Sequence, residues 1–173
     1  MKALCICLAA WMRSDSGGDP LHGDGNGWTR CDQGHRHWGR NGAAGLLLRQ
    51  AAGAAAVVVL MQHRAGWTSD GDTWGLPGGA RDSHETWVVA ALREAAEEAG
   101  IDAGALSVVG ESTDDHGGWA YVTVVADAIK PLTLTPNAES AELRWVPRDG
   151  VAALNLHPGF ARSWPRLQSD FLS

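Results

Sequence analysis

The sequence has few of the residues that typify disulfide-rich, membrane-spanning or nucleic-acid-binding proteins. Its three cysteines are too few for a disulfide scaffold, which favours a cytoplasmic location. No apolar run reaches the roughly 18 residues that a membrane span needs. With 14 lysines and arginines against 20 acidic residues, the chain lacks the basic stripe that binds a nucleic-acid polymer or an anionic membrane.

The length and composition of the chain suit one folded domain. Residues 1–27 are expected to form a flexible lead-in, because Ser14–Gly27 is rich in Gly, Asp and Ser. Residues 28–173 are expected to form a single domain, since a chain of 173 residues with 45% hydrophobic residues can bury a full core. The net charge of −6 still permits a small nucleotide substrate if metal ions supply positive charge.

The apolar runs predict a mixed α/β fold. The expected strands are Ala43–Arg49, Ala54–Gln62, Ser107–Glu111, Trp119–Ala128 and Leu143–Val146. Helices are expected over Ala90–Ala99, which has strong helix formers and no Gly or Pro, and over Pro158–Leu172, where apolar residues recur at helical spacing.

Three glutamates of the first predicted helix share one face. Glu94, Glu97 and Glu98 are spaced i, i+3, i+4, and Glu85 comes round to the same side if the helix extends back that far. Crowded carboxylates repel one another unless they face water or a cation neutralises them. Because hard oxygen ligands suit Mg²⁺ or Mn²⁺, this face is a candidate metal site.

The ends of this helix are also predicted. Asp82 or Ser83 is expected to cap its start, which would place Glu85 in the first turn. Gly100 is expected to end the helix in a left-handed conformation. The preceding segment, Trp74–Gly79, is an apolar turn with Pro and Gly residues, and such glycines let the backbone approach a ligand closely.

The segment Gly79–Ile101 resembles the Nudix box, G-x5-E-x7-R-E-U-x-E-E-x-G-U, where U is a bulky apolar residue. The matching positions are Gly79, Glu85, Arg93, Glu94, Glu97, Glu98, Gly100 and Ile101, whereas the first U is the small Ala95. The resemblance covers roughly residues 40–170. It implies a Nudix-type α/β/α sandwich with a mixed β-sheet, and a hydrolase that cleaves a diphosphate linkage of a nucleoside diphosphate derivative.

The resemblance also implies roles for individual residues. The metal-binding glutamates of the box correspond to Glu94, Glu97 and Glu98. Gly78 matches a residue whose carbonyl also binds metal, and Arg93 with Glu85 matches a pair that orients the glutamates. Members differ in the general base, so that role stays open among the three box glutamates and a downstream acid.

Residues outside the box complete the predicted site. In many members a further acid downstream of the box binds metal or acts as the general base, and Glu139 or Glu142 matches it. Which of the two corresponds depends on where a gap is placed in the match to the family, and we favour Glu139. Arg64 matches an arginine that contacts substrate phosphate in MutT-like members. His157 falls where related enzymes contact the base, and Gly79 is a further candidate for substrate binding.

Two groups of residues have weaker indications. Trp74, Trp119 and Trp164 are candidates for base stacking. Cys31, His35 and His37 form a C-x3-H-x-H pattern, for which a zinc site with Cys5 and Cys7 as further ligands is one interpretation. The spacing is unfamiliar for zinc and favours the alternative, an edge segment over His35–Trp38 before the first core strand.

The substrate follows only by elimination. The marks of the ADP-ribose, dinucleoside polyphosphate, NADH and coenzyme A types are missing; for example, no Pro lies between Ile101 and Lys130. The default is therefore a MutT-like (deoxy)nucleoside triphosphate pyrophosphohydrolase that needs Mg²⁺, with Mn²⁺ as a substitute. An ADP-ribose or nucleotide-sugar pyrophosphatase and a non-catalytic regulatory domain are the alternatives. The expected partner is a small nucleotide, and a homodimer is a candidate assembly.

Overall fold

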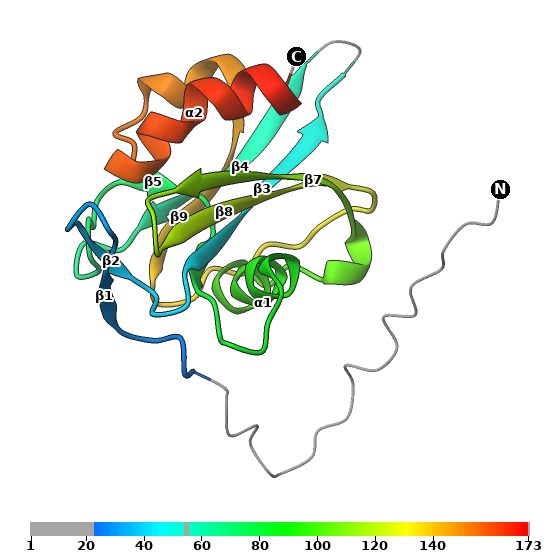
Figure 1. Cartoon of the computed structure of the whole chain (residues 1–173). Helices are drawn as coiled ribbons and strands as arrows, with labels where there is room; N and C mark the ends of the chain where they lie inside the picture. The colour runs from blue at the N-terminus through cyan, green and yellow to red at the C-terminus, as the bar shows by residue number, and fades with distance from the viewer. Residues whose placement is uncertain (1–22, 54–55, 173) are drawn as a thin grey trace, which may run out of the picture.

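The computed structural model describes residues 23–53 and 56–172, and within them a mixed sheet lies between two helices (Figure 1). The sheet has the strand order β5-β4-β3-β8-β7, with β6 paired to β3 and β9 paired to β4. Strands β3 and β8 are parallel, and the other pairs of this sheet are antiparallel. Helices α1 and α2 cover opposite faces, so the predicted α/β sandwich is confirmed.

The predicted core strands are found, with longer or shifted ends. The strands are β1 Trp28–Arg30, β2 Arg36–Trp38, β3 Ala43–Ala51, β4 Val57–Arg64, β5 Trp74–Gly75, β6 Gly78–Ala80, β7 Leu106–Asp115, β8 Ala120–Ala128 and β9 Ser140–Pro147. The helices are α1 Trp87–Ala99 and α2 Pro158–Phe171, with short 3₁₀ turns at Ala103–Ala105 and Arg148–Ala153. None of the helices in this described part has the length and apolar character needed to cross a bilayer.

The central strand β3 is buried on both faces. Leu46 and Leu48 pack into the cluster under α1, whereas Leu47 packs into the cluster under α2. This division follows from the two-residue period of a strand, which sends successive side chains to opposite faces. A continuous apolar run is what a strand covered on both sides requires.

Helix α1 begins at Trp87, before the expected Ala90 but after the predicted cap positions. Its N-cap is Thr86, whose side chain accepts a hydrogen bond from the Val89 amide at 3.2 Å. The prediction of Asp82 or Ser83 as the cap is therefore wrong, and Glu85 precedes the helix instead of lying in its first turn. The prediction for Gly100 is confirmed, because it ends the helix with a left-handed φ of 67°.

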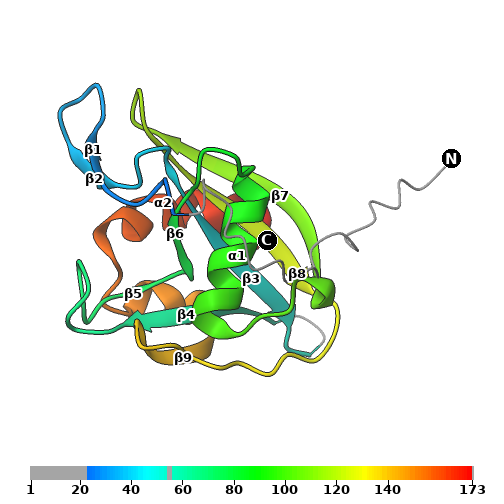
Figure 2. The same ribbon diagram turned by 90° about the horizontal axis from the view of Figure 1, so that it is seen from below.

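The segment before β1 is held against the box loop. The amides of Gly23 and Gly25 donate to the two carboxylate oxygens of Asp82 at 2.7 and 2.9 Å. Asp82 thus anchors the incoming chain, and the end of the expected flexible lead-in is fixed here. Residues 1–22, including Cys5 and Cys7, lie outside the described residues. The β1–β2 hairpin that follows forms its own small sheet beside the end of β7 and β8 (Figure 2).

Candidate active site

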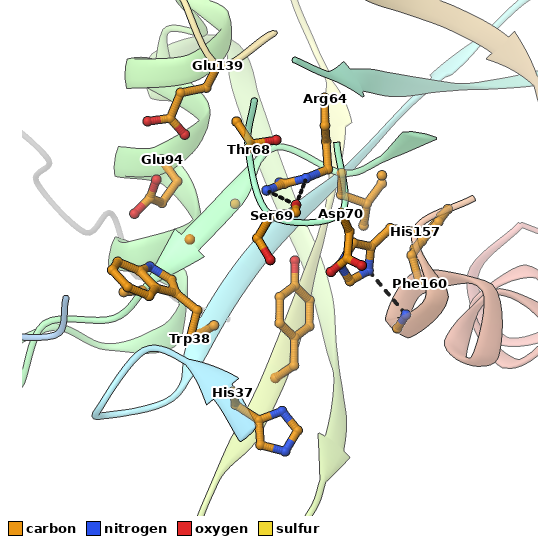
Figure 3. Close-up of a pocket in the computed structure, with 18 of the residues that line it drawn as sticks. His37, Trp38, Arg64, Thr68, Ser69, Asp70, Glu94, Glu139, His157 and Phe160 are labelled. Carbon is orange, nitrogen blue, oxygen red and sulfur yellow. Dashed lines mark hydrogen bonds and ion pairs between the residues drawn. The ribbon is translucent and has the colours of Figure 1, made fainter. Parts of the chain in front are cut away.

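One pocket of about 860 Å³ gathers most of the predicted site residues. Its walls come from the β1–β2 hairpin, β6, α1, the loop after β4 and the start of α2. Figure 3 shows Glu94 and Glu139 on one side, Arg64 in the middle and His157 on the other side. A pocket of this size accommodates a small ligand such as a nucleotide.

The three box glutamates reach the pocket from one helix face. Glu94, Glu97 and Glu98 all line it, as their i, i+3, i+4 spacing predicts. Their exposure differs, because the Glu97 side chain is 51% exposed whereas Glu94 is 14% exposed and Glu98 lies in the core. The buried pair therefore carries the larger cost of desolvation.

Arg93 and Glu85 form a buried bidentate ion pair. The Arg93 guanidinium donates to both carboxylate oxygens of Glu85, at 2.7 and 2.9 Å. It also donates to Glu94 at 2.8 Å and to the carbonyl of Ala80 at 2.9 Å. One planar fork thus links the loop, the helix and strand β6, which fixes the position of the Glu94 carboxylate.

Gly78 and Gly79 bring β6 close to the glutamates. The Gly78 amide donates to Glu98 at 2.8 Å. A Cβ atom at Gly79 would lie only 2.6 Å from a carboxylate oxygen of Glu94, and one at Gly78 would lie 2.5 Å from the carbonyl oxygen of Ala44. Glycine is required at Gly78 because the backbone of β3 lies against it, whereas a side chain at Gly79 would displace the Glu94 carboxylate.

The environment of the pocket changes the acidity of its carboxyl groups. Burial, with the charges of Glu94 and Glu139 adding to it, raises the pKa of Glu98 to about 7. Burial also raises the pKa of Glu94, although Arg93 opposes the shift. At Glu85, burial would raise the pKa, but the hydrogen bonds and charge of Arg93 and the backbone lower it. Two carboxylates that resist ionisation, with a third acid close by, fit a site for a divalent cation.

The two candidate downstream acids, Glu139 and Glu142, lie in different places relative to the pocket. Glu139 lies in the pocket, on the loop before β9, and its charge acts on Glu94 and Glu98. Glu142 does not line the pocket and forms a bidentate ion pair with Arg144, with both contacts at 2.7 Å. The structure therefore brings Glu139 to the box glutamates and leaves Glu142 on the surface of β9.

Arg64 and His157 lie across the pocket from the box helix. Arg64 donates to the carbonyl of Ser69 at 3.2 and 3.1 Å, so its guanidinium is held by the loop after β4. His157 accepts a hydrogen bond from the Gly159 amide at its Nδ1 atom and pairs with Asp70 through Nε2 at 3.3 Å. Asp70, which the sequence did not indicate, thereby orients His157, and burial lowers the pKa of His157.

The tryptophans expected to stack on a base are mostly buried. Trp74 and Trp164 are 8% and 3% exposed and belong to the core under α2, so this prediction is wrong for them. Trp119 lines the pocket but is only 9% exposed. Trp28 and Trp38 line the pocket and are 45% and 44% exposed. The sequence did not indicate them, because His35–Trp38 was interpreted only as an edge segment and Trp28 carried no motif.

Comparisons with known proteins agree with this geometry. The model of the NUDIX domain matches residues 39–167. A Mycobacterium tuberculosis protein named "Putative 8-oxo-dGTP diphosphatase 3" is 54% identical over 159 residues, which is 87% of this chain and 72% of the relative. A Bifidobacterium longum fusion of a nucleoside triphosphate pyrophosphatase and a Nudix hydrolase is 44% identical over 84% of this chain, but only 31% of the fusion is covered.

A solved structure gives the same assignment. The crystal structure of a Nudix hydrolase from Mycobacterium smegmatis is 54% identical, with a TM-score of 0.79 over 84% of this chain and 94% of that one. The box residues, their convergence on one pocket and these matches agree. The chain therefore belongs to the Nudix family of hydrolases, enzymes that cleave pyrophosphate bonds and generally depend on divalent metal ions.

Proposed function

We propose that the protein is a Mg²⁺-dependent pyrophosphohydrolase of (deoxy)nucleoside triphosphates, with oxidised purine triphosphates such as 8-oxo-dGTP as the preferred class. The observation that carries the proposal is the placement of Glu94 and Glu139 on one side of a pocket that Glu98, Arg64 and two partly exposed indoles also line. The 54% identity with the relative named as an 8-oxo-dGTP diphosphatase supports the choice of substrate.

Each proposed role follows from the position of a side chain. Glu94, Glu97, Glu98 and Glu139 hold Mg²⁺, with Mn²⁺ as a substitute, and bound metal supplies positive charge and lowers the pKa of water. Arg64 offers a guanidinium fork to phosphate oxygens. Glu85 acts only through Arg93, which keeps Glu94 in place, and is therefore a positioning residue. The general base is left among the box glutamates and Glu139.

The hairpin indoles are the proposed contacts for the base. Trp38 lies on the pocket side of β2, below Glu94 in Figure 3, and Trp28 packs against it edge to face at 5.4 Å. An exposed indole face stacks well on a flat purine. His157 and the start of α2 line the side of the pocket opposite the box helix. The imidazole of His157 is the proposed polar contact to the substrate on that side.

The test is a substrate panel with identified products. It contains the natural and oxidised deoxynucleoside triphosphates, ADP-ribose, a nucleotide sugar and a diadenosine polyphosphate, each assayed with Mg²⁺. We expect the highest kcat/KM for 8-oxo-dGTP, with nucleoside monophosphate and pyrophosphate as products. Hydrolysis in ¹⁸O-labelled water then identifies the attacked phosphorus. Release of orthophosphate, a preference for ADP-ribose or full turnover in chelator would contradict the proposal.

A further inference from the structure

A second group of metal-binding side chains lies outside the box. Cys31 follows β1, His35 and His37 come from the turn and strand of the same hairpin, and His116 comes from the turn between β7 and β8. One donor atom from each of the four residues lies within 4.8 Å of the other three. In a tetrahedral zinc site the ligand atoms are about 3.3–3.6 Å apart, so zinc binding requires the four donor atoms to move closer together.

The backbone of the two turns is already fixed in this arrangement. The Cys31 amide donates to the His35 carbonyl at 3.1 Å, and the Asp32 amide donates to the Gly117 carbonyl at 2.8 Å. A Cβ atom at Gly117 would lie 2.9 Å from the Asp32 carboxylate, so the turns meet too closely for a side chain there. The donor side chains therefore converge from two segments that the main chain holds together.

The state of His37 points to a missing partner. Its Nε2 atom is buried and has no hydrogen-bond partner among the described residues. The ring stacks on Trp119 at 4.0 Å with an interplanar angle of 9°, and its centroid lies 4.7 Å from that of His116. A buried polar atom without a partner is costly, and a bound ion is one of the few ways to satisfy it.

The donor set selects the kind of metal. It combines a buried, free thiol with three imidazoles and contains no carboxylate. Sulfur and nitrogen donors favour zinc over magnesium, and four protein ligands are typical of a structural site. Asp114 lies 3.5 Å from Nε2 of His116, where it can orient the ring while the other ring nitrogen binds metal.

We propose that Cys31, His35, His37 and His116 bind a structural Zn²⁺ ion that fixes the β1–β2 hairpin to the β7–β8 turn. The site is separate from the box glutamates and does not depend on the substrate proposed above. Its consequence for the enzyme lies in the hairpin, which presents Trp28 and Trp38 to the pocket. Zinc thus holds one wall of the pocket, whereas the metal of the box serves the chemistry.

The first test measures zinc in the full chain, purified without a histidine tag. We expect about one tightly bound Zn²⁺ per chain after dialysis, by mass spectrometry of the metal. Cys31→Ser and His116→Ala should each lose it. The double variant Cys5→Ser/Cys7→Ser and the box variant Glu97→Gln should keep it, which excludes the other thiols and the carboxylates. Absence of zinc from the wild-type protein, or its retention in both ligand variants, would overturn the proposal.

Cobalt substitution keeps the test valid if a ligand variant fails to fold. Co²⁺ in the wild-type site should give the visible absorption of a tetrahedral ion and a thiolate charge-transfer band in the near ultraviolet. An octahedral spectrum without the thiolate band would contradict the site directly.

The last measurement addresses the role of the ion. Removing zinc with a selective chelator in excess Mg²⁺ should raise KM several-fold, leave kcat within about twofold and speed amide exchange over residues 28–38. Unchanged exchange in this hairpin would show that zinc does not hold it.

Discussion

The two donor clusters at this pocket differ in chemistry and in how the chain builds them. The box glutamates offer hard oxygens from a single helix, and Arg93 already pairs with two of them, Glu94 and Glu97. The hairpin cluster offers sulfur and nitrogen from segments that lie as far apart as Cys31 and His116. The first cluster suits Mg²⁺ and catalysis, whereas the second suits Zn²⁺ and structure, so neighbouring sites in one protein can serve different ions.

The largest expected effect comes from the box. Glu98→Gln should lower kcat by about 10²–10⁴-fold, because it removes a buried carboxylate that serves as metal ligand or base. Glu97→Gln should also lower kcat. Steady-state kinetics at saturating Mg²⁺ measures the effect, with Glu142→Gln as the control. If kcat were unchanged in both box variants, these glutamates would not be the catalytic centre.

A smaller loss is expected when a methyl group is added next to the box. Gly79→Ala should reduce kcat about 10–100-fold, because its Cβ would displace the Glu94 carboxylate from the position that Arg93 sets. The melting temperature should change little, since a flexible side chain can move aside. Gly150→Ala is the matched control, because a Cβ there meets nothing closer than Val146 at 3.6 Å. Equal kcat values for the two variants would exclude this role for Gly79.

Sequence alone predicted the box because the information is local. The glutamates are close in the chain, and helical periodicity places them on one face without knowledge of the rest of the fold. The four-ligand hairpin cluster could not be found in this way, since His116 joins it only when β7 and β8 bring their turn beside the hairpin. The pattern at Cys31–His37 gave three of the four donors of this cluster, and the further ligands suggested with it, Cys5 and Cys7, lie outside the described residues.

The prediction of the residue that caps α1 failed for a similar reason. Asp82 has the chemistry of an N-cap, but its carboxylate binds the amides of Gly23 and Gly25, which are distant in sequence. Thr86 caps the helix instead. Likewise, the exposure of a tryptophan depends on packing between elements, so sequence could not distinguish the buried Trp74 from the exposed Trp38.

The downstream acids give a finer test of the box site. Glu139→Gln should lower activity about 10-fold at limiting Mg²⁺, and the deficit should shrink as Mn²⁺ is raised if the loss is mainly in metal affinity. Glu142→Gln should change little, because its partner Arg144 is half exposed and such surface pairs contribute little. Activity measured across a titration of Mg²⁺ and Mn²⁺ shows which of the two acids serves the metal site. A larger loss for Glu142→Gln would reverse the assignment.

The smallest expected effect is a loss of stability as pH rises, which comes from the box cluster. Burial raises the pKa of Glu98 from its ordinary value of 4.5 to about 7 in the folded protein. Between these two values the folded chain binds more protons than the unfolded chain, so the free energy of unfolding falls as pH rises through this window. The contribution is complete below pH 4.5 and lost above pH 7.

Glu98→Gln should therefore raise the melting temperature of the metal-free protein at pH 8 and flatten its decline between pH 5 and 8. A protein of this size shifts by about 2–4 °C for each kcal/mol, so the change is measurable by calorimetry in chelator. Mg²⁺ should stabilise the wild-type protein more than Glu98→Gln, because the ion binds the ionised carboxylate of the folded state. His116→Ala should leave the decline that Glu98 causes in place while lowering the melting temperature of the zinc-loaded protein. If the melting temperature of Glu98→Gln declined with pH as steeply as that of the wild-type protein, Glu98 would not be the group that titrates in this range. The proposed electrostatic difference between the two clusters would then be wrong.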